Sequence, residues 1–244
     1  GPSTGLPTKT EQSDLLQAMY GRNGESPVPV LAACSPGDCF ETAIEACRIA
    51  LQHMTPVVLL SDGYIANSLE PWKFPKSSDI PPIEVNFAKK SSDDDEVYLP
   101  YKREEKLVRS WAIPGTPGLA HRIGGLEKEA NTGSVSYDPA NHEYMVKIRE
   151  ERIEKIAEFI PELQIVTGLE QGDLLILGRG STYGTIQSVV DTMLAQGHMI
   201  AHAHLRHIIP FPRNLGSILS RYKPVLIPEL NNGQLSSLIR DKYL

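Results

Sequence analysis

Asp62 and Gly63 are the first residues whose position suggests a site. They come directly after an apolar run at residues 56–60, which has the composition of a strand covered on both faces. Ligands of open α/β sheets bind at the carboxyl ends of such strands. We therefore expect Asp62 and Gly63 in a loop at a cleft, although a simple strand-to-loop turn would have the same sequence.

A glycine-rich stretch at residues 178–184 (GRGSTYG) also lies between an apolar run and a helical pattern. Its glycine spacing is one residue too long for a dinucleotide-binding turn, and no acidic residue between Asp191 and Glu229 is available to hold a ribose. We interpret the stretch as a tight turn whose amides could still accept an anion. The sequence gives no role for Arg179, and nucleotide binding at this turn stays open as an alternative.

Three histidines, His202, His204 and His207, raise the question of a metal site. On a strand, His202 and His204 would share one face, whereas His207 follows the expected strand end. A zinc site needs three or four converging ligands, and no acidic neighbour supplies one. We expect polar residues near the end of a strand rather than a metal centre.

The three cysteines, Cys34, Cys39 and Cys47, fit neither a disulfide framework nor a zinc site. We expect buried or partly buried thiols. An iron–sulfur cluster usually takes four thiolates, so any such cluster would be held by another chain. The acidic run at residues 93–96 is flanked by Ser and Lys and is predicted to be a solvated loop rather than a magnesium site.

The composition of the chain limits the classes of protein to which it can belong. The chain has 244 residues, of which 41% are hydrophobic, enough for two compact units. A formal net charge of −6 argues against a general nucleic-acid binder, which needs a basic surface. No apolar run approaches the roughly 20 residues that cross a bilayer, and no signal peptide is visible, so we expect a cytoplasmic protein without a membrane partner.

Apolar runs separated by helical patterns predict an α/β fold with parallel strands. Strands are expected at residues 28–33, 56–60, 173–178, 199–205 and 224–228. Helices are expected at residues 15–20, after Ser35-Pro36, and at 140–160, 183–196 and 234–243. Thr8 and Glu11 have the spacing of a capping box for the first helix.

Two further features are predicted from the pattern. The second helix should carry one apolar face made of Phe40, Ala43, Ile44, Cys47 and Leu51. Residues 71–140, rich in proline, serine and glycine, should form a long irregular connector with one or two short strands. Such a long loop is usually functional or packed against a partner.

Six stretches, in order along the chain, resemble the α subunits of 2-oxoacid:ferredoxin oxidoreductases, and the branch acting on 2-oxoglutarate in particular. They are GPSTGLPTKTEQ (1–12), MTPVVLLSDGY (54–64), PGTPG (114–118), NHE (141–143), LRHIIPFP (205–212) and PELNNGQL (228–235). The resemblance covers nearly the whole chain.

The resemblance implies a domain organisation. Residues 1–75 would be the later part of a thiamine-diphosphate pyrimidine-binding domain with a parallel sheet. Residues 76–160 would be an irregular connector with one helix, and residues 161–244 a transketolase carboxy-terminal-like α/β domain. The chain would then be a carboxy-terminal piece. The glutamate that activates the cofactor and an arginine that grips the substrate would lie ahead of Gly1, so no catalytic residue is expected in the chain.

The resemblance also implies site residues. Thr8 would place its hydroxyl near the 2-oxoacid, a role that competes with capping a helix. Ser3, Thr4 and Gly5 would belong to the same substrate-binding loop. Asp62 and Gly63 would lie in a loop that faces the active-site cleft.

The implied reaction is oxidative decarboxylation of the 2-oxoacid to an acyl-CoA, with electrons passed to ferredoxin. Thiamine diphosphate and Mg²⁺ would be held mainly by a β subunit, which would also carry a [4Fe–4S] cluster, and coenzyme A would be the co-substrate. The chain alone is expected to be inactive. A non-catalytic α/β interaction module, or a nucleotide-binding protein using residues 178–184, are the alternatives.

Overall fold

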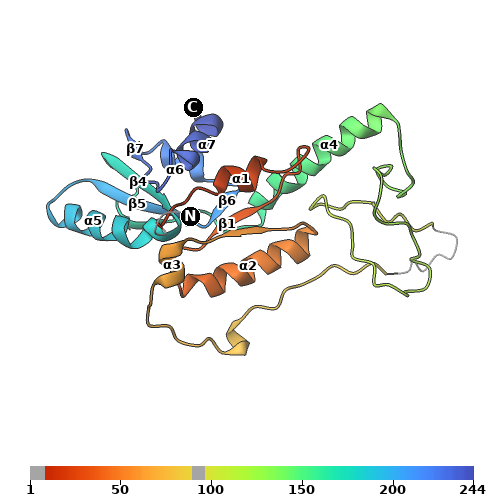
Figure 1. The fold of residues 1–244 in the computed structure, drawn as a ribbon, viewed down its shortest axis with the longest axis horizontal. Helices are drawn as coiled ribbons and strands as arrows, with labels where there is room; N and C mark the ends of the chain where they lie inside the picture. The colour runs from red at the N-terminus through yellow and green to blue at the C-terminus, as the bar shows by residue number, and fades with distance from the viewer. Residues whose placement is uncertain (1–8, 90–96) are drawn as a thin grey trace.

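The computed structural model describes residues 9–89 and 97–244, which form two β-sheets with helices packed around them and an extended connector (Figure 1). The predicted substrate residues Ser3, Thr4, Gly5 and Thr8 lie outside the described residues. The acidic run at 93–96 also lies outside them. In the described ranges, no helix is both long enough and apolar enough to cross a membrane.

The first sheet has three strands in the order β2-β1-β6. β1 (Val30–Ala32) pairs in parallel with β2 (Val58–Leu60), and α2 (Asp38–His53) connects them. β6 (His207–Ile209) joins the other side of β1 in the antiparallel direction. The prediction of an all-parallel sheet is therefore wrong. β6 follows β5 of the other sheet after a single residue, Arg206, and pairs with β1 rather than with β5.

The second sheet has the order β3-β5-β4-β7. β4 (Leu174–Arg179) is parallel to β5 (Ile200–Leu205) and β7 (Val225–Leu226), and α5 (Tyr183–Ala195) connects β4 to β5. These elements lie where the sequence predicts them. β3 (Ile165–Gly168) was not predicted, and it is antiparallel to β5, so this sheet is mixed as well.

The remaining helices are short apart from α4 and α7. They are α1 (Leu15–Tyr20), α3 (Gly63–Asn67), α4 (Pro139–Glu154), α6 (Leu215–Leu219), α7 (Gln234–Tyr243), and the 3₁₀ turns η1 (Ser77–Asp79), η2 (Lys155–Glu158) and η3 (Gly180–Thr182). Asp138 caps α4, since its Oδ1 accepts from Ala140 N at 3.0 Å. The Thr8–Glu11 capping box is wrong, because α1 begins after Asp14 and Glu11 precedes the helix.

The buried face of α2 differs from the prediction. Thr42, Ile49 and His53 are its buried residues, whereas Cys47 and Leu51 are exposed. Two stripes with helical spacing compete on this helix, and the periodicity alone does not say which one the sheet covers. The expected burial of all three cysteines is thus wrong for Cys47, while Cys34 and Cys39 are half-buried.

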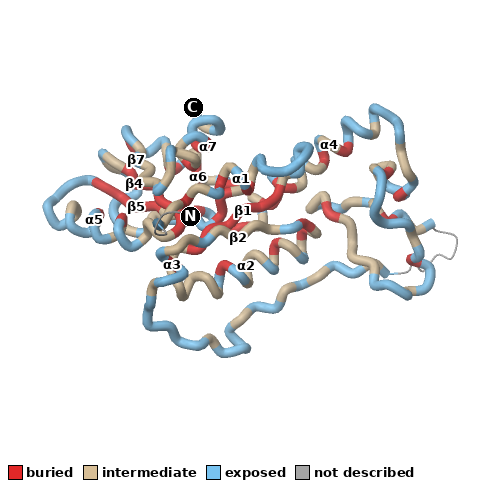
Figure 2. The backbone as a smooth tube through the Cα atoms, in the orientation of Figure 1, coloured by how far each residue is buried: buried red, intermediate tan, exposed pale blue. Residues whose placement is uncertain are grey.

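One hydrophobic core links both sheets. Val30 and Ala32 of β1 belong to the same cluster as Leu175 of β4 and Leu205 of β5. Leu31 points to the opposite face of its sheet and packs with Ile49 of α2 and with α4. Figure 2 shows this continuous buried zone at the centre, with the connector largely exposed beside it.

The connector between α3 and α4 is irregular, as predicted. Among its described residues it contains the turn η1 and two isolated bridges, Phe87 with Trp111 and Lys128 with Val135. The indole of Trp111 donates to the carbonyl of Leu51 at 2.8 Å and ties the connector to the end of α2. The domain boundaries at 75 and 160 remain a prediction.

Candidate functional site

The carboxyl ends of the parallel strands from both sheets meet at one small cavity. Its volume is about 10 Å³, and its lining includes the residues that follow β1 and β2 together with the end of β4 and part of the segment before α1. The lining residues are Glu11, Gln12, Asp14, Ala32, Ala33, Leu60, Ser61, Asp62, Arg179 and Gly180. This is the edge at which ligands of open α/β sheets bind.

Asp62 connects the two sheets at this cavity. Its Oδ1 accepts hydrogen bonds from Tyr64 N at 3.0 Å and Ile65 N at 3.1 Å, which caps α3. Its Oδ2 accepts from Ser181 N, 3.4 Å away in the turn after β4. The structure thus brings Asp62 and the 178–184 turn together, although nothing in the sequence connects these two features.

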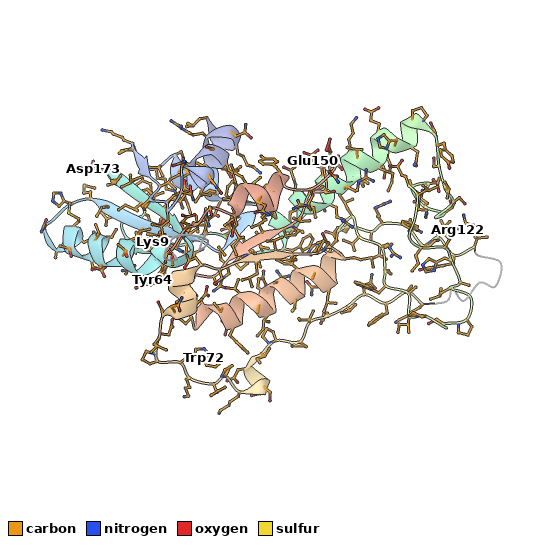
Figure 3. The ribbon with its side chains drawn as sticks, in the orientation of Figure 1. Lys9, Tyr64, Trp72, Arg122, Glu150 and Asp173 are labelled. Carbon is orange, nitrogen blue, oxygen red and sulfur yellow. The ribbon has the colours of Figure 1, made fainter. Side chains whose placement is uncertain are left out.

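Gly63 lies near Thr10, in the segment that precedes α1. A Cβ on Gly63 would be 3.8 Å from Thr10 Oγ1, which is ordinary contact. Lys9 and Tyr64, the chain neighbours of Thr10 and Gly63, are labelled near each other in Figure 3. Residues 9–12 and the Asp62–Gly63 loop are therefore neighbours in the structure.

Gln12 and Arg179 form a reciprocal pair that the sequence did not reveal. Gln12 Nε2 donates to Arg179 O at 2.9 Å, and Arg179 Nη2 donates to Gln12 O at 2.7 Å. Both side chains are almost fully buried. Burial lowers the pKa of Arg179, while Glu229, Asp62 and Asp14 act in the opposite direction. The acidic surroundings help to keep this buried guanidinium charged.

Residues of the PELNNGQL stretch (228–235) form hydrogen bonds with the segment around Gln12 as well. Gln12 N donates to Leu230 O at 3.1 Å, and Asn231 Nδ2 donates to Gln12 O at 2.9 Å. Gln234 Nε2 donates to Ser13 O at 2.8 Å. Sequence reasoning missed these roles because the partners are more than 200 residues apart in the chain.

The 178–184 turn is shaped by close packing. Gly180 has φ +61°, and a Cβ there would be 2.7 Å from Gln12 Nε2. A Cβ on Gly178 would be 2.4 Å from Ile186 Cδ1. Because the Ser181 amide faces Asp62, the chain's own carboxylate lies where a bound anion would be expected. These contacts favour the tight-turn interpretation over nucleotide binding.

His202 and His204 share a face of β5, as predicted, and form a chain of hydrogen bonds. His204 Nε2 is 3.0 Å from Gly180 O, and His202 Nε2 is 3.2 Å from His204 Nδ1. A carbonyl only accepts, so His204 carries its proton on Nε2 and accepts from His202 at Nδ1. Burial lowers the pKa of His202 to about 4 and that of His204 to about 3.

His207 is not part of this hydrogen-bond chain, and its Nε2 lies 2.9 Å from Glu45 Oε1. In residues 9–89 and 97–244, no three His, Cys, Asp or Glu side chains converge as ligands for a metal ion. Glu11, Asp14 and Asp62 line the cavity and would repel a diphosphate. The described residues therefore do not fit the diphosphate or the metal ion of a thiamine cofactor.

Residues 1–138 match the family described as pyruvate flavodoxin/ferredoxin oxidoreductase, thiamine-diphosphate-binding. This chain belongs to that family. It is 55% identical to the 2-oxoglutarate oxidoreductase subunit KorA of Mycobacterium tuberculosis, a match that covers 100% of this chain and 37% of the relative. It is 31% identical to the α subunit of 2-oxoacid:ferredoxin oxidoreductase 2 of Aeropyrum pernix, covering 98% of this chain and 37% of the relative.

The fold also matches a solved member. This is the 2-oxoglutarate:ferredoxin oxidoreductase from Magnetococcus marinus, solved with 2-oxoglutarate, coenzyme A and succinyl-CoA bound. The TM-score is 0.87 at 33% identity, covering 99% of this chain and 42% of the solved one. The predicted likeness to oxidoreductase α subunits is confirmed. The chain spans little more than a third of the length of the curated relatives named above.

Proposed function

We propose that this chain is part of the α subunit of a 2-oxoglutarate:ferredoxin oxidoreductase. The complete enzyme would convert a 2-oxoacid, coenzyme A and two oxidised ferredoxins into an acyl-CoA, carbon dioxide, two reduced ferredoxins and a proton. The observation that carries the proposal is the 55% identity to the KorA subunit over the full length of this chain. The Magnetococcus marinus enzyme, solved with 2-oxoglutarate and coenzyme A, supports the substrate class.

The part that this chain contributes is one wall of the active-site cleft. This is supported by the small cavity at which the carboxyl ends of β1, β2 and β4 converge and where Asp62 contacts the turn after β4. Thiamine diphosphate, when bound, supplies the electron sink for decarboxylation. Since the described residues fit neither its diphosphate nor a metal ion, we assign those contacts, and a [4Fe–4S] cluster, to a β subunit.

The substrate-binding residues proposed for this wall are Thr8 and the loop of Ser3, Thr4 and Gly5. Thr8 precedes Gln12 by four residues in the sequence. Gln12 lines the cavity itself.

The deciding experiment is reconstitution. The full-length α subunit and its β subunit are combined under anaerobic conditions, and reduction of ferredoxin or a one-electron dye is followed with 2-oxoglutarate and coenzyme A. We expect reduction that requires both subunits and coenzyme A, and a higher kcat/KM for 2-oxoglutarate than for pyruvate. Absence of any 2-oxoacid-dependent reduction in a fully loaded complex would reject the proposal. A preference for pyruvate would reject only the substrate assignment.

A further inference from the structure

A line of hydrogen bonds runs from the exposed Asp191 of α5 to the turn after β4. Asp191 Oδ1 lies 2.9 Å from one end of the Gln187 amide, and the other end lies 3.1 Å from His202 Nδ1. His202 Nε2 is 3.2 Å from His204 Nδ1, and His204 Nε2 is 3.0 Å from Gly180 O. The line is therefore continuous over four contacts, and His202 near its centre is fully buried.

The line ends in an acceptor on both sides, which fixes the number of protons that it needs. An ionised carboxylate and a carbonyl only accept, and each of the four contacts holds one proton. The amide of Gln187 supplies one of these protons, because it has one donor end and one acceptor end. The two imidazoles must supply the other three. Two neutral imidazoles carry only two protons, so the complete line requires a histidine pair that has bound one additional proton.

With both rings neutral, one of the four contacts lacks a proton and must open. Opening any contact made by the imidazoles would set two partly buried acceptor atoms against each other, which is costly. The contact between Gln187 and Asp191 is exposed, so water replaces it at little cost. A half-turn of the Gln187 amide then directs its Nε2 to His202 Nδ1, and Asp191 turns to solvent. The neutral pair therefore favours the turned amide.

The surroundings of the pair favour this neutral state. Burial lowers the pKa of His202 to about 4, against an opposing effect of Asp191 of α5. Burial and the neighbouring His202 lower the pKa of His204 to about 3. Asp38 of α2 acts on His204 in the opposite direction, and Arg179 of β4 acts in the same direction as burial. Proton uptake by the pair is therefore expected only in acid.

His204 also lines a pocket of about 440 Å³, and the other titratable residues of its lining are Cys34, Asp38, Glu162, Tyr183, Arg206 and His207. The charges of Asp38 and Arg206 balance, because these two side chains form an ion pair. Burial raises the pKa of Cys34 to about 12 and also raises that of Tyr183, so both are uncharged at neutral pH. The Tyr183 ring lies beside both imidazoles, with centroid distances of 5.2 and 5.0 Å.

We propose that the binding of one proton switches this line of hydrogen bonds between two states. In the neutral state the Gln187 amide donates to His202, and Asp191 is solvated. Uptake of one proton from water makes both nitrogens of His202 donors, turns the amide over and binds Asp191 to it. The switch is a property of the folded chain and does not rest on the proposed function.

One peptide group connects the switch to the cavity that Asp62 lines. The peptide between Gly180 and Ser181 accepts from His204 at its oxygen, and its nitrogen donates to Asp62 Oδ2 at 3.4 Å. Hydrogen bonds on the two sides of one peptide strengthen each other. A proton on the histidine pair therefore strengthens the bond between Ser181 and Asp62.

Nitrogen-15 NMR of the full chain with labelled histidine tests the two states, because it separates protonated from unprotonated ring nitrogens. At pH 7 we expect both His202 and His204 to be protonated at Nε2 and unprotonated at Nδ1. As the pH falls, His202 Nδ1 should gain its proton with a midpoint of about 4, and the Ser181 amide signal should shift with the same midpoint. A neutral His202 that is protonated at Nδ1 would overturn the switch.

Variants at the outer end of the line test the proton count. Asp191→Asn supplies a donor to Gln187, so two neutral imidazoles complete the line, and the midpoint should fall by about one pH unit. Gln187→Glu places a group that only accepts beside His202 Nδ1, so the midpoint should rise by about one pH unit. Asp191→Ala removes the same charge as Asp191→Asn without supplying a donor, and its midpoint should fall less.

Asp173→Asn, at an exposed aspartate before β4, is the control and should keep the parent's midpoint. Equal midpoints in the parent and Asp191→Asn would overturn the switch, and so would a midpoint in Gln187→Glu that does not rise. Equal midpoints in Asp191→Asn and Asp191→Ala would show that charge alone acts and would overturn the turning of the amide. If a variant does not fold, the ring protonation of the parent at pH 7 still decides.

Discussion

Several polar side chains are buried at positions where the sequence gives no warning. His53 is 0% exposed, and its ring lies 5.5 Å from that of Phe159. Among the described residues, neither of its ring nitrogens has a hydrogen-bond partner. Burial, helped by nearby Lys106, lowers its pKa to about 4. His53 is therefore neutral in the folded protein, and its protonation there is energetically unfavourable.

The buried histidines predict that stability falls in mild acid. His53 and His202 have pKa values of about 4 in the folded chain, against 6.5 for the unperturbed group. Between these values the unfolded state binds more protons, so the free energy of unfolding decreases as pH falls. We expect a loss of roughly 1–2 kcal/mol for each buried histidine from about pH 7 to about pH 5. Urea unfolding at the two pH values measures it.

His53→Phe should remove part of this pH dependence. The aromatic ring keeps its packing against Phe159, and no group remains to be protonated. We expect the difference in unfolding free energy between the two pH values to shrink by about 1 kcal/mol. His198→Gln, at an exposed histidine, is the control and should keep the parent's pH dependence. An unchanged pH dependence in His53→Phe would show that this histidine does not titrate as described.

Elements differ in how well the sequence predicts them. β4, α5 and β5 were predicted almost to the residue, because a buried strand and an amphipathic helix each have a distinct period. β6 was missed because only Arg206 separates it from β5, and the residues LRHII read as one continuous run. The buried face of α2 was predicted wrongly because the spacing of apolar residues in a helix does not show which face the sheet covers.

The residues of the candidate site also differ in how well the sequence predicts them. Asp62 and Gly63 were identified from a local signal, the end of an apolar run. Gln12 and Asn231 were not, because their contacts join residues 219 positions apart. The sequence around an Asn or Gln does not show whether its side chain is solvated or forms a buried hydrogen bond. Only the folded structure shows which of the two applies.

At the scale of one helix, Glu229 predicts a measurable cap. Its two carboxylate oxygens accept from Leu235 N at 2.8 Å and Ser236 N at 2.9 Å, in the first turn of α7. Glu229→Gln keeps the shape but loses the charge and one acceptor. We expect the free energy of unfolding to fall by about 1–2 kcal/mol. Glu151→Gln, at an exposed position of α4, should change it by less than about 0.5 kcal/mol; equal effects of the two would contradict the cap.

The whole molecule is organised around a core that neither half completes alone. β6, from the carboxy-terminal part of the sequence, supplies the third strand of the sheet that holds β1 and β2. Ile208 of β6 is fully buried in the cluster that contains both Leu15 and Leu175. The two sheets should therefore unfold together.

Ile208→Ala tests this cooperativity. The change removes buried methyl groups from a shared core and should cost about 2–5 kcal/mol. Both tryptophans, Trp72 and Trp111, precede α4, so their fluorescence follows the first half, whereas far-ultraviolet circular dichroism follows both halves. We expect the two signals to shift to lower urea by the same amount. A dichroism transition that shifts while fluorescence stays in place would show that the sheets unfold separately.

The single carboxylate of Asp62 has a mechanical consequence. One oxygen anchors the first turn of α3 and the other faces the turn after β4, so a displacement of either turn pulls on the other. Any motion that widens the gap between the two sheets at this point must stretch the bond to Ser181 or fray the start of α3. The position of the turn after β4 is thereby coupled to the winding of a five-residue helix.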